Sequence, residues 1–273
     1  MIFINGLRVR VGNEFINGAK KSPINYNPLN LPPYTIRLKY KNGVTPSFTK
    51  GTGVQVSQSP NIWDLTFVNS YWGDLLNFHP DLLEVLGANT TGVTSMYETF
   101  INCTSLISIS LFDTSTVSNM MHMFAGCTSL TTVPLFDTSS VTDMSVMFHT
   151  CTSLTTVPLF DTSNVSSMSE MFHSCTSLTT VPLFDTSKVT DIGAMFVRCT
   201  SLTTVPLFDT SKVTNMDNML YNCYKVESGA LALYQQASSQ AKPPISHYYT
   251  FKDCGRDTQT GSAELAQIPD DWK

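Results

Sequence analysis

The sequence contains one thirteen-residue stretch, CTSLTTVPLFDTS, four times, beginning at Cys127, Cys151, Cys175 and Cys199. The copies stand 24 residues apart, and a fixed period of this length is typical of chains in which each unit stacks on the one before it. A catalytic site needs unlike residues that converge on one point. Repetition of this kind therefore favours a stacked scaffold over an enzyme.

The first half of the unit predicts a short strand. Alternation along V-P-L-F places Val133 and Leu135 on the core face and Pro134 and Phe136 on the opposite face. Because Pro134 cannot donate a hydrogen bond to a neighbouring strand, we expect it at the edge of the strand or where its nitrogen points away.

The second half of the unit predicts a short helix. Its apolar residues follow the spacing of one helical face, and a serine precedes them as the N-cap. These apolar residues are Val141, Met144, Met147, Phe148 and Cys151. Stacked copies would bury Leu, Val, Met, Phe and Cys in continuous rows, which predicts an α/β solenoid of 24-residue strand–turn–short-helix units.

The repeat divides the chain into four predicted segments. Residues 103–222 hold five 24-residue repeats, and residues 53–102 form an N-terminal cap and a degenerate first repeat. Residues 223–273 form a C-terminal cap, with a helix over SGALALYQQASSQ and a final strand over HYYTFKDCG. Residues 1–52 read as an N-terminal β module or docking arm, because FINGLRVRV and YTIRLKYKN alternate like strands.

The unit C-x-S-L-x-x-(V/I)-x-L-F-D-T-S-x-V-x-x-M-x-x-M-F resembles the BspA-like leucine-rich repeat of bacterial surface proteins. The resemblance is close from Cys103 to Cys223, where its second part recurs as DTSSVTDMSVMF and DTSNVSSMSEMF. It implies a right-handed, leucine-rich-repeat-like array and a role in adhesion or partner recognition. The chain departs from that family in showing no signal peptide or anchor, a pattern that also fits a phage- or prophage-encoded member.

Charge and hydropathy argue against two classes of partner. Only 14% of the residues are charged and the net charge is −5, with no basic patch of the kind that binds nucleic acid. No apolar run reaches the length that spans a bilayer, so we expect no membrane insertion. The N-terminal stretch MIFINGLRVRVGNEFING has no basic region followed by a long apolar run, so we expect no secretory signal. Localisation stays open between the cell surface, which the resemblance implies, and a virion or similar particle.

Six of the seven cysteines occupy one position of the repeat, and we expect them to be free, buried thiols. A cysteine at a fixed repeat position behaves as a small buried hydrophobe, whereas disulfide scaffolds are expected in short chains with irregular spacing. Bridges between neighbouring repeats are the alternative, and they require a specific sulfur geometry. The six form a predicted structural ladder: Cys103, Cys127, Cys151, Cys175, Cys199 and Cys223.

The candidate binding surface is the predicted strand face opposite the Val and Leu positions. Aromatic side chains repeated there would form an exposed strip suited to gripping a protein or a glycan. The alternative is that the strand is turned and the phenylalanines pack inward. The candidates are Phe112, Phe136, Phe160, Phe184 and Phe208, together with Thr132, Thr156, Thr180 and Thr204.

Aspartates at one repeat position predict a second structural ladder, in which each closes an Asx turn after the strand. These are Asp113, Asp137, Asp161, Asp185 and Asp209. Calcium binding is the alternative, but the D-x-D-x-D spacing is missing from the chain. His149 and His173 share another position without a third ligand, which favours a surface pair. We expect no metal and no cofactor.

No phosphate-binding loop, nucleophile elbow, zinc-protease motif or C-x-x-C pair occurs in the sequence, so we expect no enzyme. Two functions stay open. The first is recognition or adhesion, in which the repetitive surface meets a protein or glycan. The second is a structural, decoration or host-attachment role on a phage virion or similar particle. Residues 1–50 would then mediate assembly into that particle or into a homo-oligomer.

Overall fold

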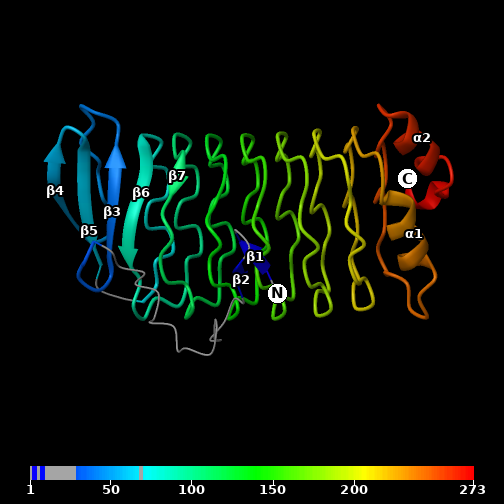
Figure 1. Ribbon diagram of the computed structural model, residues 1–273, viewed down its shortest axis with the longest axis horizontal. Coiled ribbons are helices and arrows are strands. Elements are labelled where there is room, and N and C mark those ends of the chain that lie inside the picture. The colour runs from blue at the N-terminus through cyan, green and yellow to red at the C-terminus, as the bar shows by residue number, and fades with distance from the viewer. Residues whose placement is uncertain (1, 5–6, 10–28, 68–69) are drawn as a thin grey trace.

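The computed structural model describes residues 2–4, 7–9, 29–67 and 70–273. Figure 1 shows an elongated molecule in which the repeats lie side by side as narrow transverse loops. A β-sheet lies at one end of this row and two short helices lie at the other. Much of the predicted docking arm, residues 10–28, lies outside the described residues.

A five-stranded sheet in the order β4-β5-β3-β6-β7 begins the row of repeats. The first three neighbouring pairs are antiparallel, whereas β6 pairs with β7 in parallel, so the last pairing carries the sheet into the repeats. Its strands are β3 (Thr35–Tyr40), β4 (Thr52–Gln58), β5 (Asn61–Thr66), β6 (Leu82–Asn89) and β7 (Ser108–Ile109). Two further strands, β1 (Ile2–Ile4) and β2 (Leu7–Val9), form an antiparallel pair of their own.

The predicted α/β solenoid of strand–turn–short-helix units is wrong. Within the described part of the repeats, β7 is the one named strand, and no helix occurs between residues 103 and 222. Successive units are joined by isolated parallel bridges 24 residues apart, such as Asn119 with Asp143 and Asp143 with Ser167. The α-helices are α1 (Ala230–Ser238) and α2 (Gln259–Leu265), followed by a 3₁₀ turn at Asp270–Trp272.

The predicted helix does not form because its backbone N–H groups bond to the next repeat. A helix needs each N–H to reach the carbonyl four residues earlier. Here alternate N–H groups donate to carbonyls 23 residues ahead, and the groups between them close tight turns to the third residue back. The inter-repeat bonds run from Met144 to Ser167, Val146 to Ser169, Phe148 to Met171 and Thr150 to His173, at 2.7–3.1 Å.

Left-handed residues interrupt the same segment twice in each repeat. Val146 and Thr150 have φ angles of 62° and 60°, a region that an α-helix of L-residues cannot enter. The same two positions are left-handed in the neighbouring units, for example at Glu170 and Ser174. The spacing of Met and Phe in this segment therefore reflects a chain of turns whose buried side chains happen to fall at the positions of a helical face.

The core is a set of rows that run from repeat to repeat. Phe124, Phe148, Phe172 and Phe196 stack with ring centroids 5.6–5.7 Å apart and nearly parallel planes. Each cysteine of the repeat donates its thiol to a backbone carbonyl of the preceding unit, as Cys151 does to Phe124 at 3.1 Å. Because every row crosses the unit boundaries, burial in one repeat depends on its neighbours.

The predicted alternation in the first half of the repeat is also wrong. Val133 and Phe136 are buried, whereas Leu135 is only partly buried. The cause is a tight turn in which the N–H of Phe136 donates to the carbonyl of Pro134 at 3.0 Å. This turn swings the phenylalanine into the core, where its ring lies 6.3 Å from that of Phe124.

The C-terminal end agrees with the prediction in part. The helix expected over SGALALYQQASSQ is confirmed as α1. The final strand expected over HYYTFKDCG is wrong, because these residues form tight turns whose carbonyls accept hydrogen bonds from N–H groups of the last repeat. Trp272 is buried at this end and stacks on His247, with ring centroids 4.1 Å apart. None of the helices in the described residues is long and apolar enough to cross a membrane.

Candidate functional site

The residues predicted to form an exposed aromatic strip separate into two groups. The expectation that the phenylalanines are exposed is wrong: Phe112, Phe136, Phe160, Phe184 and Phe208 are all 2% exposed or less. The threonines of the same candidate surface, Thr132, Thr156, Thr180 and Thr204, are exposed. The turn at Pro134 explains the difference, since it moves the phenylalanine inward and the preceding leucine outward.

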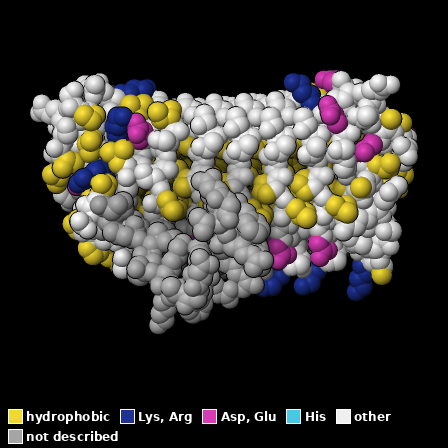
Figure 2. All heavy atoms as spheres, viewed as in Figure 1, with side chains coloured by type: hydrophobic (Ala, Val, Ile, Leu, Met, Phe, Trp, Pro, Cys, Tyr) yellow, Lys and Arg dark blue, Asp and Glu magenta, His cyan; other side chains and the backbone are white. Residues whose placement is uncertain are grey.

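A column of five leucines takes the place that was expected for the phenylalanines, with four of them exposed and Leu135 partly buried. We call this set the leucine column: Leu111, Leu135, Leu159, Leu183 and Leu207. Leu159, Leu183 and Leu207 are 41%, 59% and 52% exposed. Figure 2 shows a face with hydrophobic side chains gathered along the middle of the repeats, and acidic and basic side chains next to each other toward its lower edge. The leucine column is thus a regularly spaced apolar surface.

The aspartates of the repeat each accept a hydrogen bond from the backbone N–H two residues ahead. These bonds join Asp113 to Ser115, Asp137 to Ser139, Asp161 to Ser163, Asp185 to Ser187 and Asp209 to Ser211, at 2.8–3.1 Å. The hydrogen bonds from Ser187 lower the pKa of Asp185. No group of three metal-ligating side chains suited to holding a metal ion occurs in the part of the chain that the structure describes.

The cysteines are placed as structural thiols. All seven are free and buried, and burial raises the pKa of Cys103 and of Cys223 to about 12. A thiol reacts as its thiolate. A pKa this high leaves almost none of the thiolate at neutral pH.

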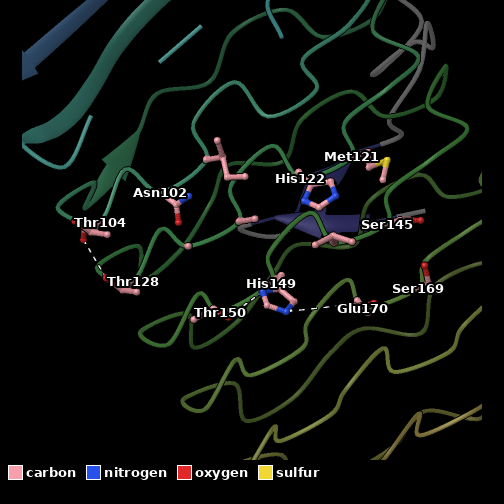
Figure 3. A pocket seen from close by; sticks show the side chains of 14 residues that line it. Asn102, Thr104, Met121, His122, Thr128, Ser145, His149, Thr150, Ser169 and Glu170 are labelled. Atoms are coloured by element: carbon pink, nitrogen blue, oxygen red, sulfur yellow. Dashed lines mark hydrogen bonds and ion pairs between the residues drawn. The ribbon is translucent and has the colours of Figure 1, made fainter. Parts of the chain in front are cut away.

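A groove of about 740 Å³ opens on the turn segments. Its walls include Asn102 on one side and His149 and Thr150 on the other, with Ala125 and Gly126 between them. Figure 3 shows polar side chains from several neighbouring turns around the opening. The further lining residues are Ile101, Thr104, Met121, His122, Thr128, Ser145, Val146, Ser169 and Glu170.

The groove exists because one repeat carries small residues where its neighbours carry larger ones. Ala125–Gly126 occupies the position of His149–Thr150 in the following unit and of Ile101–Asn102 in the preceding one. Gly126 lies so close to the Asn102 side chain that an added Cβ would meet its Oδ1 atom. The departure of Ala125–Gly126 from the repeat is visible in the sequence, but the sequence analysis did not predict that it opens a groove.

Histidines and one carboxylate set the electrostatics of the groove. The His149 and His173 rings stack with centroids 4.5 Å apart, and the Nε2 atom of His149 lies 3.7 Å from a carboxylate oxygen of Glu170. The hydroxyl of Thr150 lies 2.9 Å from Nδ1 of His149. Burial lowers the pKa of His149, which favours the neutral ring at neutral pH. Glu170 is then the groove's negative charge, and neither Lys nor Arg lines it.

These features define a class: a repeat protein built from stacked 24-residue units, with a leucine column and a groove on its surface. A family described as "Mycoplasma protein of unknown function, DUF285" matches residues 77–157 and 131–235. The two matches together cover more than half of the chain. The chain belongs to this family.

Comparison with solved structures finds a likeness to a leucine-rich repeat protein from Eubacterium ventriosum ATCC 27560. The two share 19% identity with a TM-score of 0.35, and the match covers 61% of this chain and 36% of that one. Comparison with curated proteins finds no match. Neither the family's description nor that of the leucine-rich repeat protein names an enzymatic activity.

Proposed function

We propose that this protein is a non-enzymatic recognition protein that adheres to a partner protein through the leucine column. The observation that carries the proposal is the exposure of leucines at one position of successive repeats, with Leu183 and Leu207 more than half exposed. Contiguous exposed apolar surface marks interaction sites on soluble proteins. A scaffold that only stacks has no need of leucine at a position facing solvent.

The geometry of the leucine column favours a partner segment that is extended and apolar. The Asp185 and Asp209 side chains are exposed two residues after Leu183 and Leu207. Lys188 and Lys212 are exposed three residues further on, so each of these two units presents one negative and one positive charge beside its leucine. Because the repeats advance in equal steps, an extended apolar chain laid along them would meet a leucine at each step.

Binding to immobilised purified extracellular proteins tests the proposal. The expected result is binding that survives enzymatic removal of glycans and that Leu183→Lys/Leu207→Lys abolishes. Thr190→Lys, at an exposed position outside the leucine column, is the matched control and should bind like the parent. Binding that is lost with the glycans, or that the leucine variant retains, would overturn the proposal.

The site of action is tested by peptide mass spectrometry on fractions of the source culture. Enrichment on the washed cell surface supports an adhesin. Enrichment with sedimented particles instead supports the second function, decoration or host attachment on a phage virion or similar particle. In that case residues 1–50 are the segment to test for docking.

A further inference from the structure

The groove at Ala125–Gly126 has the volume of a small-ligand site. Its volume of about 740 Å³ lies within the range of roughly 300–1,000 Å³ typical of such sites. It interrupts an otherwise regular surface, since the same register position is filled by His149–Thr150 and His173–Ser174 in the next two units. None of the leucine column lines it, so it is a separate surface.

The polar groups around the groove can both donate and accept hydrogen bonds. The Asn102 amide donates and accepts, and so do the hydroxyls of Thr104 and Ser169. The Thr128 hydroxyl donates to the Thr104 carbonyl at 3.2 Å and can still accept. The Glu170 carboxylate has two oxygens and accepts up to about four hydrogen bonds. One of these oxygens lies 3.7 Å from the His149 ring, which is an ion-pair distance and leaves the oxygen free to accept. A ligand rich in hydroxyl groups matches this mixture.

The charge of the groove selects against anions. Lys and Arg are missing from its lining, and the half-buried His149 ring favours its neutral form, because burial lowers its pKa. An anionic ligand would therefore face Glu170 without a Lys or Arg to compensate the charge. Ile101, Met121 and Val146 add apolar surface, which can pack against the C–H face of a sugar ring.

We propose that this groove binds a neutral mono- or disaccharide, with Glu170, Asn102 and the lining hydroxyls as its hydrogen-bonding partners. The side chains removed at Ala125 and Gly126 create the space, and Glu170 supplies the acceptor. The inference does not depend on the proposed function, because the leucine column and the groove share no residue.

The test uses the full chain and a panel of neutral sugars: glucose, galactose, mannose, fucose, N-acetylglucosamine and lactose. Sialic acid and glucosamine serve as charged comparators. Saturation-transfer NMR identifies binding, and titration gives Kd for the parent and its variants. Ala125→His/Gly126→Thr refills the groove with the residues of the next repeat. Val197→His/Arg198→Thr makes the same change at the equivalent position three repeats further on, outside the groove.

The refilled protein should keep its fold, because Thr150 adopts the same left-handed conformation as Gly126, with φ 60° against 75°. The clash at Gly126 is with the tip of the flexible Asn102 side chain, which can move. We expect at least one neutral sugar to bind the parent. The affinity should fall by about tenfold or more in the refilled variant and in Glu170→Gln, and stay unchanged in the control.

Three results would overturn the proposal. They are the absence of binding by every neutral sugar in the panel, equal affinity in the refilled variant, and preference for sialic acid over the neutral sugars. Circular dichroism of each variant shows whether a loss of binding comes with a loss of fold. If the refilled variant unfolds, Glu170→Gln alone decides the outcome, since a carboxylate-to-amide change at a half-exposed position leaves the core untouched.

Discussion

The imidazole rings of His149 and His173 stack across the boundary of two repeats, with centroids 4.5 Å apart and planes 13° apart. Burial lowers the pKa of both rings below the ordinary 6.5. The charged and titratable neighbours of His149 are Glu170 and His122, and those of His173 are His149, Glu170 and Arg198. The unfolded chain therefore binds protons more strongly than the folded one. The stacked pair contributes its full stabilisation above pH 6.5, and loses it as the pH falls through the lowered pKa values.

This relationship predicts a pH-dependent stability that His149→Asn/His173→Asn weakens. The free energy of unfolding of the parent should fall between about pH 7 and about pH 5, and the variant should show a shallower fall. The variant should keep some dependence of stability on pH, because burial also lowers the pKa of His79. Urea denaturation at several pH values measures both slopes. Identical slopes in parent and variant would show that the pair is not the proton-linked element.

A second prediction concerns the left-handed backbone at Val146, where φ is 62°. A β-branched residue is strained in this region, while Asn tolerates it well. Val146→Asn should therefore raise the free energy of unfolding by about 1 kcal/mol. The chain supplies its own control, because Asn218 holds the same position three repeats later with φ 56°. Asn218→Val should lower stability by a similar amount, and a stabilising effect there would contradict the explanation.

The buried cysteines predict a two-stage thiol titration. Burial raises the pKa of Cys103 and of Cys223 to about 12, and raises that of Cys127 well above its ordinary value. A disulfide-forming reagent at about pH 8 should therefore find few reactive thiols in the native protein. Unfolding without reductant should expose the seven cysteines of the chain. A folded protein that yields one thiol or none after unfolding would indicate bridges between repeats.

The sequence predicts the period of this protein, and with it the buried rows at the Cys151 and Phe148 positions, but not the backbone between them. Apolar residues at every third or fourth position suit a helix, and they suit a chain of turns equally. The difference lies in whether the N–H of Phe148 bonds within its own segment or to Met171 of the next repeat. Packing against the next repeat decides between these two hydrogen-bond patterns, so the periodicity alone predicted a helix where the chain forms turns.

The same limit applies to the surface features. The Pro134–Phe136 turn reverses the alternation that a strand would impose, which exchanges the leucine for the phenylalanine on the exposed side. Ala125–Gly126 stands out from the other units in the printed sequence. Whether this pair opens a groove depends on which side chains the stacking of repeats brings around it. One of these, Glu170, lies 44 residues after Gly126 in the sequence. The break in the repeat at Ala125–Gly126 was therefore the feature of the sequence that could have indicated the groove.

Two adjacent residues, Leu159 and Phe160, provide the sharpest test that the phenylalanine is buried and the leucine exposed. Phe160 is 2% exposed and stacks on Phe148 at 6.3 Å, whereas Leu159 is 41% exposed. Phe160→Ala removes a ring from the core and should lower the free energy of unfolding by about 3–5 kcal/mol. Leu159→Ala should change it by no more than about 0.5 kcal/mol, since its side chain faces solvent. Urea denaturation of the two variants measures the difference. A strand with regular alternation would give the opposite order, with the leucine variant the less stable of the two.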